Sequence, residues 1–380
     1  MRSLLILVLA TALPFSLRAQ SSSANTSGTV SSSVGQPATA TGDTSASAAA
    51  SDDSSAPSDF AQPAAQQSKS PSTADTKGNK PRPGLDTDRP PIGGSMVGYI
   101  DNAVIGNEIR IRFDAGFDDN APDRAEFFYA QCGCDGGTAR GPKPGLVLNL
   151  NFQQLYIRAE YAPIKYFSAF VDVPVRWIQP QRFDPATIPS GGFGSQSGIS
   201  DVEIGVKAAV VASSERYVTL QLVAAFPSGD STRGLGTAHY TVSPSLLFFQ
   251  RVTDRFSLEG QLGYSHPFAG DTPGFAGDIF TYGVGPSYEL YRGERVRIAP
   301  VIEMVGWRVL GGKENNDAEL IASGFTNPLI SSDGTNIVNI KAGVRTSFGA
   351  HHSFYVGYGQ AVTHDLWYKH IVRLEYRYSF

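Results

Sequence analysis

The sequence predicts an all-β protein: a transmembrane antiparallel β-barrel of about twelve strands behind a disordered N-terminal tail. Apolar and polar residues alternate with period two in a series of segments between residues 107 and 380. Phe and Tyr collect at the segment ends, and charged residues make up only 17% of the chain, against about 25% in ordinary soluble domains. We expect a signal peptide at 1–19, the tail at 20–95 and the barrel at 96–380.

The N-terminal region has the composition of an export signal followed by a chain that cannot fold. Arg2 precedes an apolar stretch at 4–15, and Ala19 is a small residue before a plausible cleavage point. An N-terminal anchor helix is the alternative. Residues 20–95 are rich in Ser, Ala, Thr and Pro, so they bury too little apolar area to offset the entropy of ordering. We expect a linker there, with a periplasmic spacer or a tail that contacts the cell wall as the alternative.

Each expected strand puts apolar residues on one face and polar residues on the other. In the first, Ile109 and Ile111 alternate with Arg110 and Arg112. The alternation slips at Gln153-Gln154, which predicts a bulge, and we expect further bulges at Pro244, Pro286 and Pro300. The twelve segments are 107–117, 148–161, 166–177, 200–211, 217–226, 240–248, 256–264, 280–290, 296–304, 338–346, 354–362 and 370–380.

Short turns alternate with long loops along most of the chain, as in the hairpins of outer-membrane barrels. The last strand must then pair with the first, and an even number of strands places both chain ends in the periplasm. A soluble sandwich also alternates, but its strands average five or six residues and its inner face is dry. Here the segments are longer, and aromatic residues predict two interfacial belts. These belts include Tyr161, Tyr166, Tyr217, Phe249, Phe256, Tyr291, Phe348 and Phe354 at the short turns and Trp177, Phe226, Tyr240, Phe268, Trp307 and Trp367 towards the long loops.

The charged residues of the polar face are the candidate functional residues, because a dry core would not tolerate them. We expect them to line a lumen that is open or is narrowed by inward-folded long loops, and clustered arginines there would attract anions or polar aromatic molecules. Arg–Glu pairs that merely fill a narrow barrel are the alternative. The expected pore-lining residues are Arg110, Arg112, Asp172, Arg176, Glu203, Lys207, Glu259, Arg297, Glu303, Lys341, Arg345, Arg373, Glu375 and Arg377.

Composition and local motifs offer no catalytic or metal site. The net charge of −4 excludes a generally basic nucleic-acid binder, and two cysteines exclude a multi-cysteine zinc module. Cys132 and Cys134 could form a local disulfide, stay free or pair between molecules, or form an incomplete metal site. Twelve strands also suit an outer-membrane phospholipase, but His266 beside Ser265 and His364 beside Asp365 lack that family's spacing. We therefore expect no catalytic residue and no cofactor.

Two stretches resemble known bacterial proteins. Tyr376, Tyr378 and Phe380 resemble the terminal signal by which the barrel assembly machinery recognises outer-membrane proteins. The stretch Gly198-Ile199-Ser200-Asp201-Val202-Glu203-Ile204-Gly205-Val206-Lys207 and the later Ala225-Phe226-Pro227-Ser228-Gly229 resemble the outer-membrane transporters of phenol-degradation (meta-pathway) operons.

That resemblance implies a channel in the cell outer membrane for passive passage of small, often aromatic molecules, and the clustered arginines extend the expectation to anionic ones. A structural barrel that tethers the membrane, and an acyl hydrolase, are the alternatives. The expected partners are outer-membrane lipid and lipopolysaccharide, the assembly machinery and a small solute, with no nucleic acid.

Overall fold

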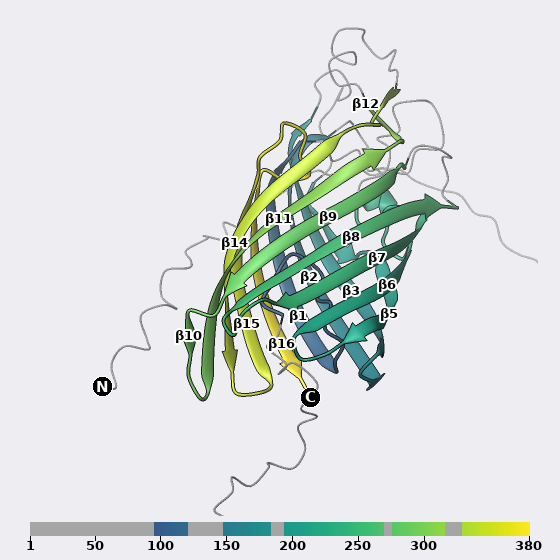
Figure 1. Ribbon diagram of the computed structural model, residues 1–380. Coiled ribbons are helices and arrows are strands. Elements are labelled where there is room, and N and C mark those ends of the chain that lie inside the picture. Colours follow the sequence, from purple (N-terminus) through teal and green to yellow (C-terminus); the bar gives the residue numbers. More distant parts are fainter. Residues whose placement is uncertain (1–94, 121–146, 184–193, 270–275, 316–328) are drawn as a thin grey trace, which may run out of the picture. The chain divides into compact units, whose positions relative to one another are not determined.

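The computed structural model describes residues 95–120, 147–183, 194–269, 276–315 and 329–380 (Figure 1). The expected signal peptide, nearly all of the expected tail, and both Cys132 and Cys134 lie outside these residues. No helix in the described ranges is long and apolar enough to cross a membrane.

Twelve strands form one closed antiparallel barrel (Figure 1). Each strand pairs with its neighbour in the chain, and β16 pairs with β1 in a register that places Arg377 opposite Arg110. Both the strand number and the pairing of last with first strand are thus confirmed. The barrel strands are β1 (Glu108–Asp119), β2 (Val147–Ile164), β3 (Phe167–Phe183), β5 (Val202–Ala212), β6 (Arg216–Phe226), β7 (Tyr240–Arg251), β8 (Phe256–Phe268), β9 (Asp278–Tyr288), β11 (Val296–Leu310), β14 (Asn336–Phe348), β15 (His352–Ala361) and β16 (His370–Ser379).

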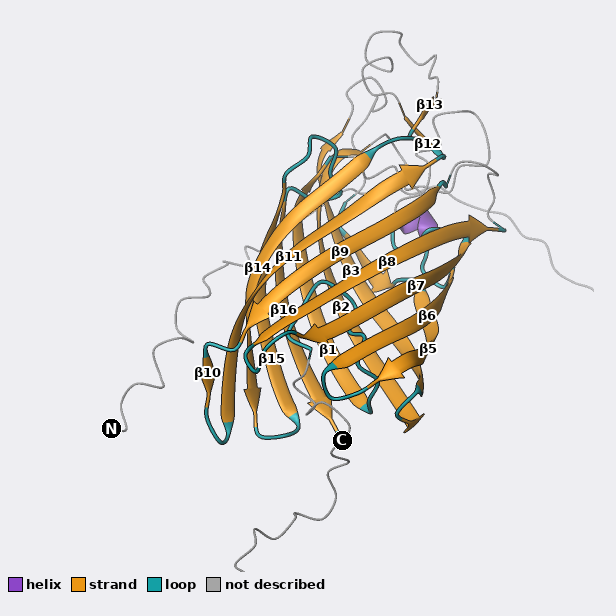
Figure 2. Ribbon diagram, in the orientation of Figure 1, coloured by secondary structure: helices purple, strands orange, loops and turns teal. Residues whose placement is uncertain are grey.

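The remaining elements are short and belong to the connections (Figure 2). β4 (Gln196–Ile199) pairs with β3, and β10 (Tyr291–Arg292) pairs with β11. β12 (Lys313–Asn315) and β13 (Leu329–Ser331) form a separate two-stranded sheet. The 3₁₀ helix η1 (Ser231–Arg233) begins after Asp230, whose side chain caps it.

The two faces of the wall differ as the alternation predicts. Outward side chains such as Leu220 and Ile302 are 52% and 58% exposed, whereas the inward Glu303 and Arg345 are 0% and 1% exposed. An apolar outer surface of this extent is unfavourable in water and favourable in lipid. The fold is therefore that of an outer-membrane β-barrel.

Aromatic residues mark both rims of the outer surface, but four of those expected in the two interfacial belts lie elsewhere. Phe226, Tyr240 and Phe268 are exposed near the long loops, and Tyr240 stacks on Phe268 with ring centroids 5.7 Å apart. Tyr378 and Phe380, of the expected assembly signal, stack at the opposite rim. The expectation was wrong for four residues. Tyr217, Phe249 and Trp307 share the period-two phase of the inward residues of their strands, and Trp367 packs on Trp307 from the β15–β16 connection.

The expected bulges were also wrong in position. The pairing of β2 with β1 and β3 is continuous across Gln153 and Gln154, and the apparent slip arises because Leu150 and Phe152 point inward. Beside Pro244, β7 and β8 lose paired residues without a change of register. Pro286 and Pro300 likewise lie in ladders of unshifted register.

Candidate functional site

An irregular segment, residues 95–106, with bends at residues 98–100 and 104, lies inside the barrel before β1 begins; we call it the inner segment. Its backbone N–H groups bind carboxylates of the wall. Met96 donates to Glu259 (2.8 Å), whereas Gly98, Tyr99 and Ile100 donate to Glu303 (3.1, 2.8 and 2.8 Å). Buried backbone groups outside a ladder need such partners, so these two inward carboxylates substitute for a neighbouring strand.

The carbonyl groups of the inner segment bind inward arginines and a hydroxyl. Arg345 donates to Met96 O (3.0 Å) and Val97 O (2.7 Å), and Arg373 donates to Gly98 O (2.5 Å). Further along, Thr219 donates to Ala103 O (2.6 Å). The inner segment is therefore held from β6, β8, β11, β14 and β16, around much of the circumference.

Apolar packing completes this part of the lumen. Met96, Val97 and Ile100 are at most 2% exposed and belong to a cluster with Tyr355 and Val301. Tyr355 packs against Gly98 so closely that a Cβ there would lie 2.2 Å from the ring, and its hydroxyl donates to Glu303 (3.1 Å). The half of the lumen near the short turns is consequently filled.

Ion pairs satisfy the charges of the filled half. Glu375 binds Arg345 at 2.7 Å and Arg377 at 2.6 Å, with both Glu375 and Arg345 side chains fully buried. Asp172 binds Arg158 at 2.9 Å and Arg110 at 3.4 Å, and Lys207 binds Glu160 at 2.9 Å. Such pairs are tolerated in an interior only because each charge has a partner.

All of the residues expected to line a lumen occupy inward positions. Arg112, Glu203 and Arg297 are half-buried, and the others are buried. Glu259, Glu303, Arg345 and Arg377 contact the inner segment, Arg176, Glu203 and Lys341 face a cavity, and Arg373 does both. The long loops that were expected to narrow the lumen lie largely outside the described residues; within those residues the inner segment occupies the lumen. Sequence reasoning missed that segment and the inward residues Gln154, Arg158 and Glu160, and it left Asp114 out of the lining set although alternation puts that residue on the polar face.

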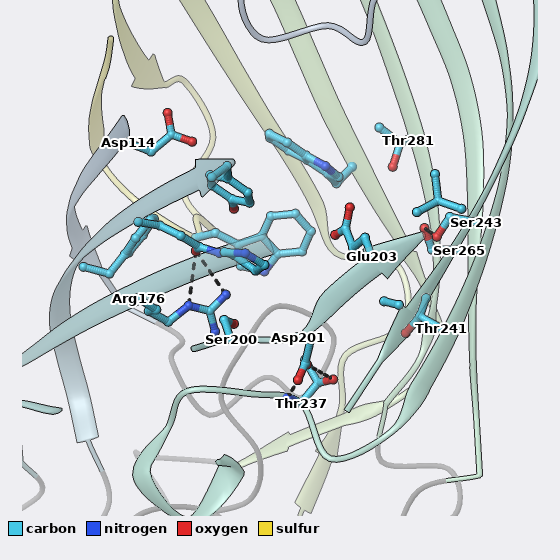
Figure 3. A pocket seen from close by; sticks show the side chains of 18 of the residues that line it. Asp114, Arg176, Ser200, Asp201, Glu203, Thr237, Thr241, Ser243, Ser265 and Thr281 are labelled. Carbon is cyan, nitrogen blue, oxygen red and sulfur yellow. Dashed lines mark hydrogen bonds between the residues drawn. The ribbon is translucent and has the colours of Figure 1, made fainter. Parts of the chain in front are cut away.

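The outer cavity, of about 360 Å³, lies in the half of the lumen towards the long loops (Figure 3). Tyr99 of the inner segment contributes to its lining. Neighbouring strands β7, β8 and β9 contribute small hydroxyl residues, and the rest of the wall contributes aromatic residues and charges. The hydroxyl residues are Thr241, Ser243, Ser265 and Thr281, and the aromatic residues are Phe152, Tyr156, Trp307, Trp367 and Tyr368.

Charged groups at the cavity are mostly engaged with each other. Arg373 makes two bonds to Asp114 (2.6 and 2.7 Å), and Lys341 donates to Tyr368 Oη (3.0 Å). Arg176 donates twice to Gln154 Oε1 (3.2 and 3.1 Å). Glu203, by contrast, makes no hydrogen bond or ion pair with any described residue.

The two stretches that carried the family resemblance meet at the edge of this cavity. Asp201 accepts hydrogen bonds from the backbone N–H of Gly229 (3.0 Å) and of Thr237 (2.8 Å). Ser228 donates to Ser200 O (3.0 Å). These bonds fix the β6–β7 connection over β5, and burial within this connection lowers the pKa of His239.

The candidate hydrolase residues do not form a site. Ser265 lies on the inward face, where it accepts a hydrogen bond from Ser243 (2.8 Å), whereas His266 points outward and pairs with Asp278 (2.6 Å). His364 and Asp365 are both exposed in the β15–β16 connection. Among the described residues no cluster of three His, Cys, Asp or Glu side chains could hold a metal ion.

No protein-family model and no curated protein matches the chain. Several solved structures do. An outer-membrane channel from Pseudomonas putida F1 aligns with 75% of this chain and 99% of its own, at 12% identity and a TM-score of 0.48. A KdgM porin aligns over 72% and 99% (12% identity, TM-score 0.35), and LpxR from Salmonella typhimurium over 72% and 100% (7% identity, TM-score 0.39). At these identities the likeness concerns the fold.

Proposed function

We propose that this barrel is an outer-membrane channel for the passive passage of small solutes, and that the inner segment closes it at rest. The observation that carries the proposal is the outer cavity, a hollow in the lumen whose lining includes Tyr99 of the inner segment. A barrel that served only as a structural tether would gain nothing from a hollow whose lining keeps Glu203, Thr241 and Thr281 without a hydrogen-bond partner among the described residues. The tether is therefore the second candidate.

The inner segment is suited to move because side chains hold it. Within the described residues its backbone makes no ladder with any strand, and its bonds run to groups such as Glu303, Arg345 and Thr219. When the segment withdraws, water can replace each of these bonds one at a time. Displacing a barrel strand would instead break two continuous ladders.

The export and placement of the chain belong to the same proposal. We expect cleavage near Ala19, insertion by the barrel assembly machinery through the face that carries Tyr376, Tyr378 and Phe380, and contact of the outer surface with lipid and lipopolysaccharide. The exposed apolar wall, with Leu220 and Ile302 about half exposed, supports the lipid contact.

A reversible lock tests the gate. A Cβ built on Gly283 of β9 would lie 3.2 Å from Cγ1 of Ile100 in the inner segment. The sulfur of a cysteine at position 100 would occupy a γ position like that of this atom, which brings it within reach of a disulfide with a cysteine at position 283. We therefore design Ile100→Cys with Gly283→Cys in a background that carries Cys132→Ser and Cys134→Ser, so that no other thiol competes.

The oxidised double variant should abolish swelling of proteoliposomes in arabinose and ion conductance in planar bilayers, and a reductant should restore both. Each single cysteine variant, treated identically, is the matched control. Equal passage in the oxidised and reduced states would show that the inner segment is not the gate. A folded, reconstituted chain that neither swells vesicles nor conducts ions, even in a variant that releases the inner segment, would remove the channel and leave the tether.

A further inference from the structure

The lining of the outer cavity has the chemistry of a ligand site as well as of a path. We propose that it binds a small neutral polyhydroxylated molecule, of the size class of a mono- or disaccharide. This inference rests on the proposed function, since the bound molecule would be the solute that the channel passes. The volume of the outer cavity, about 360 Å³, falls in the range of small-molecule sites, roughly 300–1,000 Å³.

One side of the cavity offers hydroxyl groups that are free to bind. Ser243 donates to Ser265 (2.8 Å), but the hydroxyls of Thr241 and Thr281 make no hydrogen bond with any described residue. The pairing of Gly263 with Thr281 and of Ser265 with Ile279 places these small residues on adjoining strands. A hydroxyl both donates and accepts, so it matches the hydroxyls of a polyol in either direction.

The aromatic residues of the cavity offer apolar faces. The rings of Trp307 and Trp367 lie with centroids 5.0 Å apart at 59°, and those of Phe152 and Tyr368 lie 6.1 Å apart in an edge arrangement. The C–H faces of a sugar ring can pack on such surfaces while its hydroxyls reach the Ser and Thr side chains.

The charges of the cavity favour a neutral ligand over an anion. Arg373 is occupied by Asp114, Arg176 by Gln154, and Lys341 by Tyr368, with Lys341 Nζ also 4.1 Å from the ring centroid of Tyr99. The three basic residues of the lining are matched in number by the acidic residues Asp114, Asp201 and Glu203, so the cavity offers an anion no net formal charge to attract it. Glu203 keeps its acceptor capacity, which suits ligand hydroxyls and repels a carboxylate.

Tryptophan fluorescence can report binding separately from transport. Two of the three tryptophans, Trp307 and Trp367, line the cavity. Trp177→Phe removes the remaining one, which lies on the outward phase of β3. The full-length protein in this background is titrated with maltose, gluconate and benzyl alcohol as the neutral, anionic and aromatic probes.

We expect saturable quenching by maltose, and about tenfold weaker binding when Thr241→Val and Thr281→Val are combined. Thr346→Val, on the outward face of β14, is the matched control and should leave binding unchanged. Saturable quenching by gluconate or benzyl alcohol but not by maltose would overturn the neutral-polyol assignment. So would unchanged maltose binding in the double valine variant.

Vesicle swelling on the same samples separates the two proposals. Swelling without any fluorescence response would refute the binding site and leave the channel. Maltose binding without swelling, even when the inner segment is released, would refute the channel and leave the site.

Discussion

The two halves of the lumen share the same twelve strands but differ in what they contain. Near the short turns, bulky side chains such as Arg345, Tyr355 and Phe249, together with the inner segment, leave the interior filled. Near the long loops, the wall of β6 to β9 carries small residues such as Ala225 and Ser265, and a cavity remains.

The difference shows that strand number alone does not decide whether a barrel is open. Eight strands are filled by side chains and sixteen leave a channel, so twelve is an intermediate case. In this barrel the sizes of the inward residues decide, at each height along the barrel axis, whether the lumen is filled or hollow. Near the short turns the inner segment also fills space that the wall alone would leave. The following changes test that division.

The largest effect should come from the ion pairs of the filled half. Glu375→Gln removes the charge that balances Arg345 and Arg377, and leaves two buried guanidinium groups without a counter-ion. Loss of one partner of a buried pair typically costs about 3–5 kcal/mol. We expect a loss of that size in the free energy of unfolding, measured by urea titration of the folded barrel. Glu215→Gln, in the exposed β5–β6 turn, is the control, and equal unfolding midpoints for the two variants would contradict the prediction.

A second change should open the filled half without unfolding it. Glu303→Gln replaces the carboxylate that accepts hydrogen bonds from three inner-segment N–H groups and from Tyr355 Oη with a neutral amide, which is a weaker acceptor. Hydrogen bonds to a charged group are roughly twice as strong as neutral ones, and 1.4 kcal/mol corresponds to about tenfold in an equilibrium. We expect the open probability in single-channel recordings to rise about tenfold or more.

Glu160→Gln is the matched control for this opening, since Glu160 binds Lys207 and Ser168 and does not contact the inner segment. A similar rise in both variants would mean that general loosening of the lumen, and not release of the inner segment, opens the path.

The hollow half should respond to added bulk. Ser265→Phe places a large ring in the outer cavity, whereas His266→Phe, one residue further on, faces outward. We expect a several-fold slower arabinose swelling rate for the first variant and an unchanged rate for the second, with both proteins folded. Equal rates would indicate that solutes do not use the cavity.

Much of the wall was predictable from sequence because alternation reports which face of a strand a residue occupies. It placed Arg345, Glu375 and Arg377 on the inward face, and it predicted the closure of β16 on β1. On β2 the alternation led to a wrong prediction, the bulge at Gln153-Gln154. Leu150 and Phe152 are apolar although they point inward, so the pattern assigned them to the outward face.

The inner segment could not be predicted in the same way. Its contacts join residues far apart in the chain, such as Gly98 and Glu303, which are 205 positions apart, and they run from backbone to side chain. Such contacts leave no periodic pattern in the sequence. Trp307 and Trp367 were assigned to an interfacial belt because composition alone does not distinguish an aromatic residue at a lipid boundary from one that lines a cavity.

The smallest effect is expected on the outer surface. Asp278 accepts a hydrogen bond from Tyr264 Oη (2.5 Å) and contacts His266 Nδ1 (2.6 Å), but the His266 side chain is 57% exposed. Exposed pairs contribute little because solvent screens them and their side chains must be ordered to form them. Asp278→Asn should therefore change neither the urea midpoint nor the swelling rate measurably, in contrast to Glu375→Gln. A loss of stability comparable with that of Glu375→Gln would show that contacts on the outer face, and not only those in the filled half of the lumen, hold the barrel together.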